Sequence, residues 1–101
     1  METIRIGPID FKYVESELIV SNDAKQLDGK ITYNKQQIEV ASPYPEQYRR
    51  LVLWHEIVHG ILNLAGRDCD DEGLIDALAG GIVQVLRDNP QLREFIEQVK
   101  A

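Results

Sequence analysis

The stretch that decides the fold is residues 46–65, EQYRRLVLWHEIVHGILNLA. Apolar residues recur there every three to four positions, which predicts an α-helix. They form two rows on different sides, and a helix that is apolar on most sides is buried. Pro45 suits the start of a helix, because its missing N–H costs nothing there, and Gly66 ends the pattern. We therefore expect a buried helix over residues 46–65 at the centre of the fold.

Short segments typical of β-strands fill the first forty residues. They alternate polar and apolar residues or are rich in β-favouring types, and turn-forming residues separate them. The candidate strands are residues 3–6, 9–14, 18–20, 30–33 and 37–40. The last two flank Asn34-Lys35-Gln36, which predicts a hairpin over residues 30–40. We expect a small antiparallel sheet in this part of the chain.

A second helix is predicted beyond residue 70. Asp70 or Asp71 can cap it, and the helix dipole favours acidic side chains at that end. The apolar stripe that we expect to be buried is Leu74, Ile75, Leu78, Ala79, Ile82 and Leu86. Gly80 and Gly81 lie mid-helix, where each glycine costs about 1 kcal/mol relative to alanine. Such a pair suggests that another backbone packs closely there.

A third helix follows, because Asn89-Pro90 ends the second one and starts another. We expect this helix, residues 90–101, to pack on the core and not to cover a cleft. Its apolar face is Leu92, Phe95, Ile96 and Val99. Strands first and helices afterwards indicate an α+β fold. A length of 101 residues allows one domain, residues 1–101.

Composition limits the class of protein. Eleven basic against seventeen acidic side chains give a net charge of −6, which argues against a nucleic-acid partner and against docking on anionic membranes. No apolar run approaches the ~20 residues that a membrane helix needs. The N-terminus lacks the features of a secretory signal, and one cysteine leaves no internal disulfide. We therefore expect a cytoplasmic protein.

The two histidines of the chain both lie in the central helix and form an HExxH motif. His55 and His59 are four residues apart, and Glu56 follows the first. Residues four apart share one face of a helix, so both imidazoles can reach one zinc ion at about 2.0–2.1 Å. Glu56 lies to the side of that axis and can take a proton from metal-bound water instead of ligating. We predict a zinc site with His55 and His59 as ligands and Glu56 as the catalytic base.

A catalytic zinc site takes three protein ligands and keeps one position open. The chain has no third histidine, so the third ligand is a carboxylate, with Cys69 as the alternative. The carboxylates within reach are Asp68, Asp70, Asp71, Glu72 and Asp76. Glu72 and Asp76 are four apart and share a face of the second predicted helix. Glu72 can then ligate, while Asp76 accepts the other N–H of a zinc-bound histidine.

The HExxH motif, followed by the segment Glu72-Gly73-Leu74-Ile75-Asp76-Ala77-Leu78-Ala79, resembles the gluzincin metallopeptidases. It is most similar to their short branch from phages and bacterial mobile elements, the ImmA/IrrE-like and minigluzincin proteins. The similarity covers roughly residues 29–92. It implies strands, an active-site helix and a second helix whose early glutamate, here Glu72, is the third zinc ligand. It also implies that Asp76 supports a zinc-bound histidine.

The resemblance implies a zinc-dependent peptidase that hydrolyses peptide bonds. Its peptide or protein substrate would lie extended along one strand of the hairpin over residues 30–40, paired through the backbone. Relatives act on or with DNA-binding repressors, so a repressor is one expected substrate. The alternative is a metal-binding regulatory or interaction module with little peptidase activity. The acidic charge and the carboxylate ligand argue against metal-dependent hydrolysis of nucleic acid.

The chain departs from larger gluzincins in one respect. Those proteins add a histidine or tyrosine that stabilises the oxyanion, and this chain has no spare histidine. The side chains that can take its place are Tyr33, Tyr44, Tyr48, Arg49 and Arg50. A missing oxyanion donor costs about 10²–10³ in rate. We therefore expect a peptidase that is weak or that needs a partner.

Overall fold

The structure, a computed structural model, describes residues 2–98 of the chain. Its strands are β1 (Thr3–Ile6), β2 (Ile9–Ser16), β3 (Ile19–Val20), β4 (Gln26–Leu27), β5 (Gly29–Thr32) and β6 (Gln37–Ala41). Its helices are α1 (Glu46–Leu64), α2 (Glu72–Asp88) and α3 (Gln91–Glu97). The predicted α+β fold is confirmed, with each predicted strand and helix present. None of the helices in the described part of the chain is long and apolar enough to cross a membrane.

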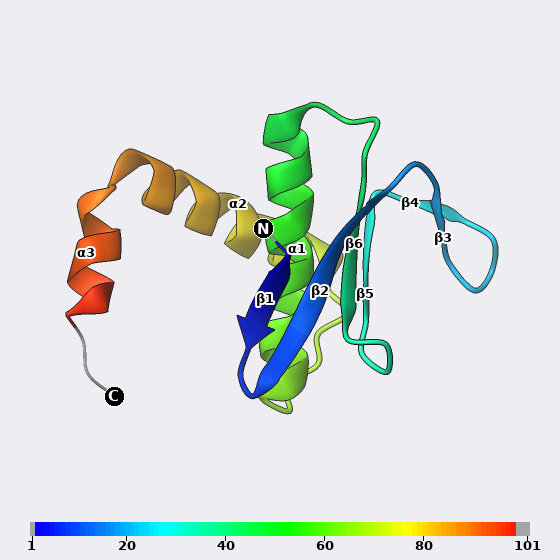
Figure 1. The fold of residues 1–101 in the computed structure, drawn as a ribbon, viewed down its shortest axis with the longest axis horizontal. Coiled ribbons are helices and arrows are strands. Elements are labelled where there is room, and N and C mark those ends of the chain that lie inside the picture. Colours follow the sequence, from blue (N-terminus) through cyan, green and yellow to red (C-terminus); the bar gives the residue numbers. More distant parts are fainter. Residues whose placement is uncertain (1, 99–101) are drawn as a thin grey trace.

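The main sheet has the strand order β1-β2-β6-β5, and β3 and β4 form a separate pair that projects beside it (Figure 1). The predicted hairpin is β5–β6, which is antiparallel, as is β1–β2. The expectation of an antiparallel sheet is wrong for the central pairing, since β2 and β6 run parallel. Parallel neighbours need a crossover of a dozen or more residues, and the segment between β2 and β6 supplies it. The alternation of polar and apolar residues shows which face of a strand is buried. It does not show which strand lies beside it.

Helix α1 packs across the main sheet and closes the core. The fully buried sheet residues include Phe11, Ile38 and Val40, and α1 adds Val52, Leu53 and Ile57. Gly60 lets the helix lie close to the sheet, because a Cβ there would lie 2.9 Å from Ile6 Cδ1 and 3.0 Å from Ile31 Cδ1. The turn of α1 that carries His59 is therefore held against the sheet.

Helix α2 buries less of its apolar stripe than expected. Ile75 and Ala79 are buried beside Val58 of α1, and Ile82 and Leu86 are only half-buried. Leu74 and Leu78 are 49% and 42% exposed, so the prediction is wrong for those two. Figure 1 gives the reason: α2 crosses α1 near its own N-terminus and then runs away from the sheet. Only residues on one narrow face of its first turns can reach α1.

The glycine pair of α2 has no close neighbour. A Cβ at Gly80 or Gly81 would meet nothing within 4 Å, so the expectation of a closely packed backbone there is wrong. Gly80 borders the cavity between β5, α1 and α2, and Gly81 is exposed, so neither glycine is needed for a close contact between backbones.

Helix α3 does not pack on the core, contrary to expectation. None of its residues is buried, and Phe95 and Ile96 are 64% and 59% exposed. It follows the far end of α2, beyond the turn at Asn89 and Pro90, and so begins away from the sheet (Figure 1). Val99, predicted on the same face, and the rest of 99–101 lie outside the described residues.

Candidate metal centre

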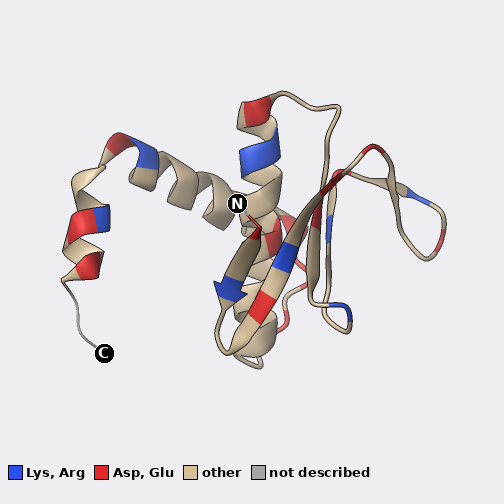
Figure 2. Ribbon diagram, viewed as in Figure 1, with Lys and Arg blue, Asp and Glu red and all other residues tan. Residues whose placement is uncertain are grey.

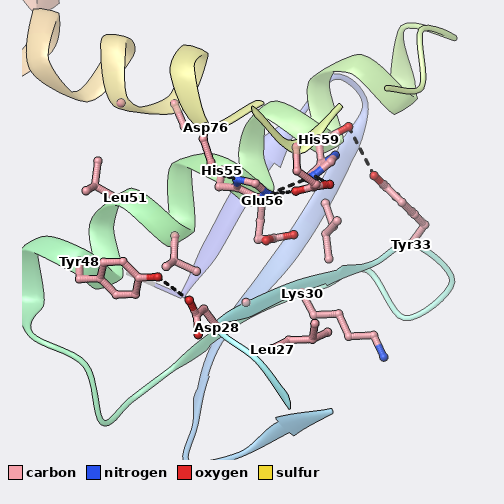
Figure 3. A pocket seen from close by; sticks show the side chains of 16 residues that line it. Leu27, Asp28, Lys30, Tyr33, Tyr48, Leu51, His55, Glu56, His59 and Asp76 are labelled. Atoms are coloured by element: carbon pink, nitrogen blue, oxygen red, sulfur yellow. Dashed lines mark hydrogen bonds and ion pairs between the residues drawn. The ribbon is translucent and has the colours of Figure 1, made fainter. Parts of the chain in front are cut away.

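A cavity of about 830 Å³ lies between β5, α1 and α2. Figure 2 shows acidic segments where α1 meets the start of α2, and Figure 3 shows the side chains that line the cavity. His55, Glu56 and His59 line it from α1, and Glu72 and Asp76 line it from α2. The structure thus brings the residues that the sequence singled out to one cavity.

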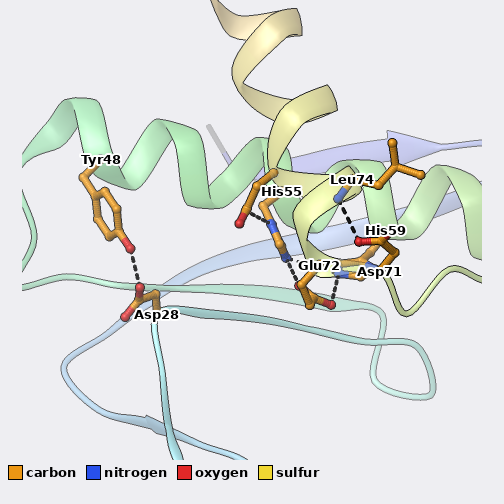
Figure 4. A network of polar contacts seen from close by, with 8 residues as sticks. Asp28, Tyr48, His55, His59, Asp71, Glu72 and Leu74 are labelled. Carbon is orange, nitrogen blue, oxygen red and sulfur yellow. Dashed lines mark hydrogen bonds and ion pairs between the residues drawn. The ribbon is translucent and has the colours of Figure 1, made fainter.

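Three of these side chains converge on one point, and we call them the His–His–Glu cluster (His55, His59 and Glu72; Figure 4). The Nε2 atoms of the two histidines lie 3.2 Å apart. Glu72 places Oε2 at 2.7 Å from Nε2 of His55 and Oε1 at 3.0 Å from Nε2 of His59. All three ligand atoms therefore face one another across the junction of α1 and α2.

The cluster fits a zinc ion. Ligands about 2.0–2.1 Å from a tetrahedral ion lie roughly 3.4 Å from one another. The three side chains need only a small outward movement from the 2.7–3.2 Å separations of their atoms. Two imidazole nitrogens and one carboxylate are also a donor set that zinc accepts, and the cavity leaves room for a fourth ligand.

Helix α2 presents two carboxylates to His55. Asp71 caps this helix by accepting a hydrogen bond from the N–H of Leu74 at 3.1 Å, which places Glu72 in the first turn. Asp76, one turn later, lies with Oδ1 at 2.7 Å from Nδ1 of His55. The ring of His55 is thus held between Asp76 and Glu72, with Nε2 directed into the cluster.

The other carboxylates and the cysteine considered as ligands lie elsewhere. Cys69 packs against the buried group of Val58, Ile75 and Ala79. Asp68 accepts a hydrogen bond from Asn63 Nδ2 at 2.7 Å. Asp71 is used in capping, and Asp70 is an exposed residue of the same loop.

Glu56 lies deeper than the His–His–Glu cluster, with 7% of its surface exposed. Burial raises the pKa of its carboxyl from 4.5 to about 7. His55 and a backbone hydrogen bond from Ile31 lower this pKa, and Glu72 raises it. A carboxyl with a pKa near neutrality can both accept and return a proton. Its position therefore suits general acid–base chemistry.

Gly29 allows Glu56 to lie against β5. A Cβ at Gly29 would lie 2.5 Å from Val52 Cγ1 and 3.3 Å from Glu56 Oε2. Sequence reasoning did not find this residue, because Asp28-Gly29 is also ordinary turn chemistry. Only the crossing of α1 over β5 shows that the position lacks room for a side chain.

Strand β5 borders the cavity and is an edge of the main sheet. The N–H of Ala41 donates to the carbonyl of Asp28 at 2.8 Å. Backbone groups in an antiparallel pair alternate between the partner and the opposite side, so those of Gly29 and Ile31 point to the open edge. The hydrogen bond from Ile31 to Glu56 agrees with that direction.

The structure separates the side chains considered for oxyanion stabilisation. Tyr33 and Tyr48 line the cavity; the hydroxyl of Tyr33 donates to the carbonyl of His59 at 3.4 Å, and that of Tyr48 donates to Asp28 (Figure 3). Tyr44 also donates to Asp28, at 2.8 Å, but does not line the cavity. The two arginines form ion pairs away from it, Arg49 with Glu15 and Arg50 with Glu46.

Comparisons with protein-family models, with curated proteins and with solved structures found no match to this chain. The resemblance to gluzincins stays a prediction that rests on the motif and its spacing.

Proposed function

We propose that the protein is a small zinc-dependent peptidase of the gluzincin type, similar to the ImmA/IrrE-like and minigluzincin proteins. The observation that carries the proposal is the His–His–Glu cluster, whose three ligand atoms lie within 4.8 Å of one another beside a buried glutamate. His55, His59 and Glu72 would hold the ion, and Asp76 would orient His55 through Nδ1.

The reaction assigns a different task to each group. A bound zinc ion supplies a Lewis acid that lowers the pKa of water and polarises the peptide carbonyl. Glu56 takes the proton of the attacking water and returns it to the leaving amine, which its raised pKa of about 7 favours. Glu56 is only 7% exposed, so little bulk water reaches this carboxyl.

The open edge of β5 supports a peptide as substrate. An extended chain can add to this edge through the outward backbone groups of Gly29 and the outward carbonyl of Ile31, because the N–H of Ile31 is hydrogen-bonded to Glu56. Its carbonyl would then enter the cavity that Glu56 and the His–His–Glu cluster both line. The lone cysteine, which leaves no internal disulfide, supports the cytoplasm as the compartment.

Metal content is the first test of the proposal. We expect about one zinc per chain in the dialysed protein by elemental mass spectrometry, and loss of that zinc in His59→Ala. Glu56→Gln is then expected to retain zinc and to lose cleavage of a peptide library. A Glu56→Gln variant that cleaves as fast as the parent would remove Glu56 from the role of base.

The alternative function is a metal-binding interaction module, with a repressor as one candidate partner. The exposed apolar side chains of α2 and α3 favour it: Leu74, Leu78, Val85, Phe95 and Ile96. A partner protein that binds the zinc-loaded chain and is never cut would support the module. Cleavage of that partner by the parent but not by Glu56→Gln would support the peptidase.

A further inference from the structure

One carboxylate of the cavity stands apart from the candidate metal centre. Four carboxylates line the cavity, and Glu72 and Asp76 contact the histidines, while Glu56 is buried beside His55. Asp28 contacts neither histidine, and no lysine or arginine within residues 2–98 forms an ion pair with it. Its negative charge therefore faces the cavity without a cation from the described chain.

Two tyrosines hold the carboxylate of Asp28 in place. Tyr44 donates to Oδ1 at 2.8 Å. Tyr48 donates to Oδ2, as Figure 4 shows. The two rings stack edge to face with centroids 5.0 Å apart. A carboxylate offers about four lone-pair positions, so two stay free for a ligand. The ring of Tyr48 also lines the cavity, and an aromatic face attracts a cation.

Lys30 does not supply a cation to Asp28. Among residues 2–98, it is the only lysine or arginine that lines the cavity. Figure 3 shows its amine directed away from Asp28 and from the histidines.

The position of Asp28 relates it to the site of reaction. Asp28 directly precedes Gly29, whose missing Cβ leaves the space taken by Val52 and Glu56. Residues in an extended chain advance about 3.3 Å each. A peptide lying along β5 with its scissile bond beside Glu56 therefore carries a side chain to Asp28 within about two residues of that bond.

We propose that Asp28 is a specificity-determining residue that binds a cationic nitrogen group of the substrate, within about two residues of the scissile bond. This inference rests on the proposed function, since it uses the same cavity and a peptide along β5. The cation can come from a lysine or arginine side chain or from the amino terminus of the peptide. The substrate class is thus a basic peptide segment.

Binding of three matched peptides tests the inference. Each has eight residues and a fluorophore; the first carries a central arginine with both ends capped, and the second replaces arginine by neutral citrulline. The third is the citrulline peptide with a free amino end. Anisotropy with Glu56→Gln, with and without added zinc, measures affinity without cleavage. We expect the arginine peptide or the free-amine peptide to bind about tenfold more tightly than the capped citrulline peptide. About tenfold in affinity is the effect expected of one charged hydrogen bond that is partly exposed to solvent.

Asp28→Asn, made in the same background, identifies the residue responsible. Asparagine keeps the size of the side chain and one acceptor oxygen. The variant is therefore expected to reduce the preference for the cationic peptides over the capped citrulline peptide to less than twofold. Binding of the capped citrulline peptide should stay unchanged. Tyr44→Phe removes one donor but keeps the charge, and should retain the preference. Equal affinity for all three peptides overturns the inference. Equal weakening of the arginine and citrulline peptides in Asp28→Asn also overturns it, because that result indicates a structural role.

Cleavage by the parent protein separates this inference from the proposed function. A binding preference that Asp28→Asn removes, without cleavage of any peptide, supports the cation site and contradicts the peptidase. Cleavage with no preference in rate or binding supports the peptidase and contradicts the cation site. Absence of binding to every peptide contradicts both. Where cleavage occurs, mass spectrometry should place the cut within about two residues of the arginine.

Discussion

Oδ1 of Asp76 lies 2.7 Å from Nδ1 of His55, although 21 positions separate the two residues. The other ring nitrogen of His55 lies 2.7 Å from Glu72. Both contacts come from one face of α2, because its two carboxylates are one helical turn apart. A carboxylate behind a ligating histidine fixes the ring and increases its basicity. The angle at which α2 crosses α1 thus determines the orientation of His55.

Removal of the Asp76 carboxylate is expected to weaken zinc binding. The change Asp76→Ala should lower affinity by about 10- to 100-fold, as loss of such a partner does in zinc proteins. Competition with a chromophoric chelator measures this. Asp70→Ala is the control, since Asp70 is an exposed loop residue outside the His–His–Glu cluster. Equal affinity in the two variants would show that Asp76 does not support the metal.

A methyl group at Gly29 is expected to disturb the packing of α1 on β5. In Gly29→Ala the new Cβ would lie 2.5 Å from Val52 Cγ1 and 3.3 Å from Glu56 Oε2. Overpacking of this kind costs about 1–3 kcal/mol in the free energy of unfolding. Urea denaturation measures the loss, and peptide cleavage should fall as Glu56 is displaced.

The same clash predicts a rescue. Val52→Ala removes the closest atom, so the double variant Gly29→Ala/Val52→Ala should lose less stability than the two single changes added together. An additive result would place the origin of the loss elsewhere, since residues without a shared contact have additive effects.

Replacement of Gly81 by alanine is expected to stabilise the protein, whereas the same change at Gly29 destabilises it. A Cβ there meets nothing within 4 Å, and alanine is favoured over glycine inside a helix by about 1 kcal/mol. Gly81→Ala should therefore raise the free energy of unfolding by up to about that amount. A lower stability by urea denaturation would indicate that this face of α2 is packed in solution.

The stability of the zinc-free protein is expected to fall as pH rises through the range set by Glu56. Its pKa is 4.5 in the unfolded chain and about 7 in the fold, chiefly because of burial. The folded state holds the proton more tightly, so this contribution is fully present below pH 4.5 and is lost as pH rises to about 7. The loss amounts to roughly 3 kcal/mol.

Glu56→Gln isolates this effect, because glutamine cannot ionise. With a chelator present, the difference in unfolding free energy between parent and variant should change between pH 4.5 and 7 and level off above it. A difference that stays constant across that range would contradict the raised pKa of Glu56.

Helix α1 shows how much of the structure can be predicted from the local sequence pattern. Its bounds follow from the apolar periodicity, and the structure agrees to within one residue at its end. The second helix shows the limit. Local chemistry limited its cap to Asp70 or Asp71, and the structure shows Asp71, whereas the exposure of Leu78 was not predictable. An amphipathic stripe predicts which face can be buried, and only the direction of α2 determines how much of that face finds a partner.

The sequence by itself determined the order of the helices and of every strand except β4, and it placed His55 and His59 on one helical face with Glu56 beside them. These features depend on residues a few positions apart, whose geometry the backbone dictates. Only the tertiary structure decided that β5 borders the cavity, that Gly29 makes room for Glu56, and that no lysine or arginine of the described residues pairs with Asp28. Those relationships join segments far apart in the chain, and packing between elements sets them.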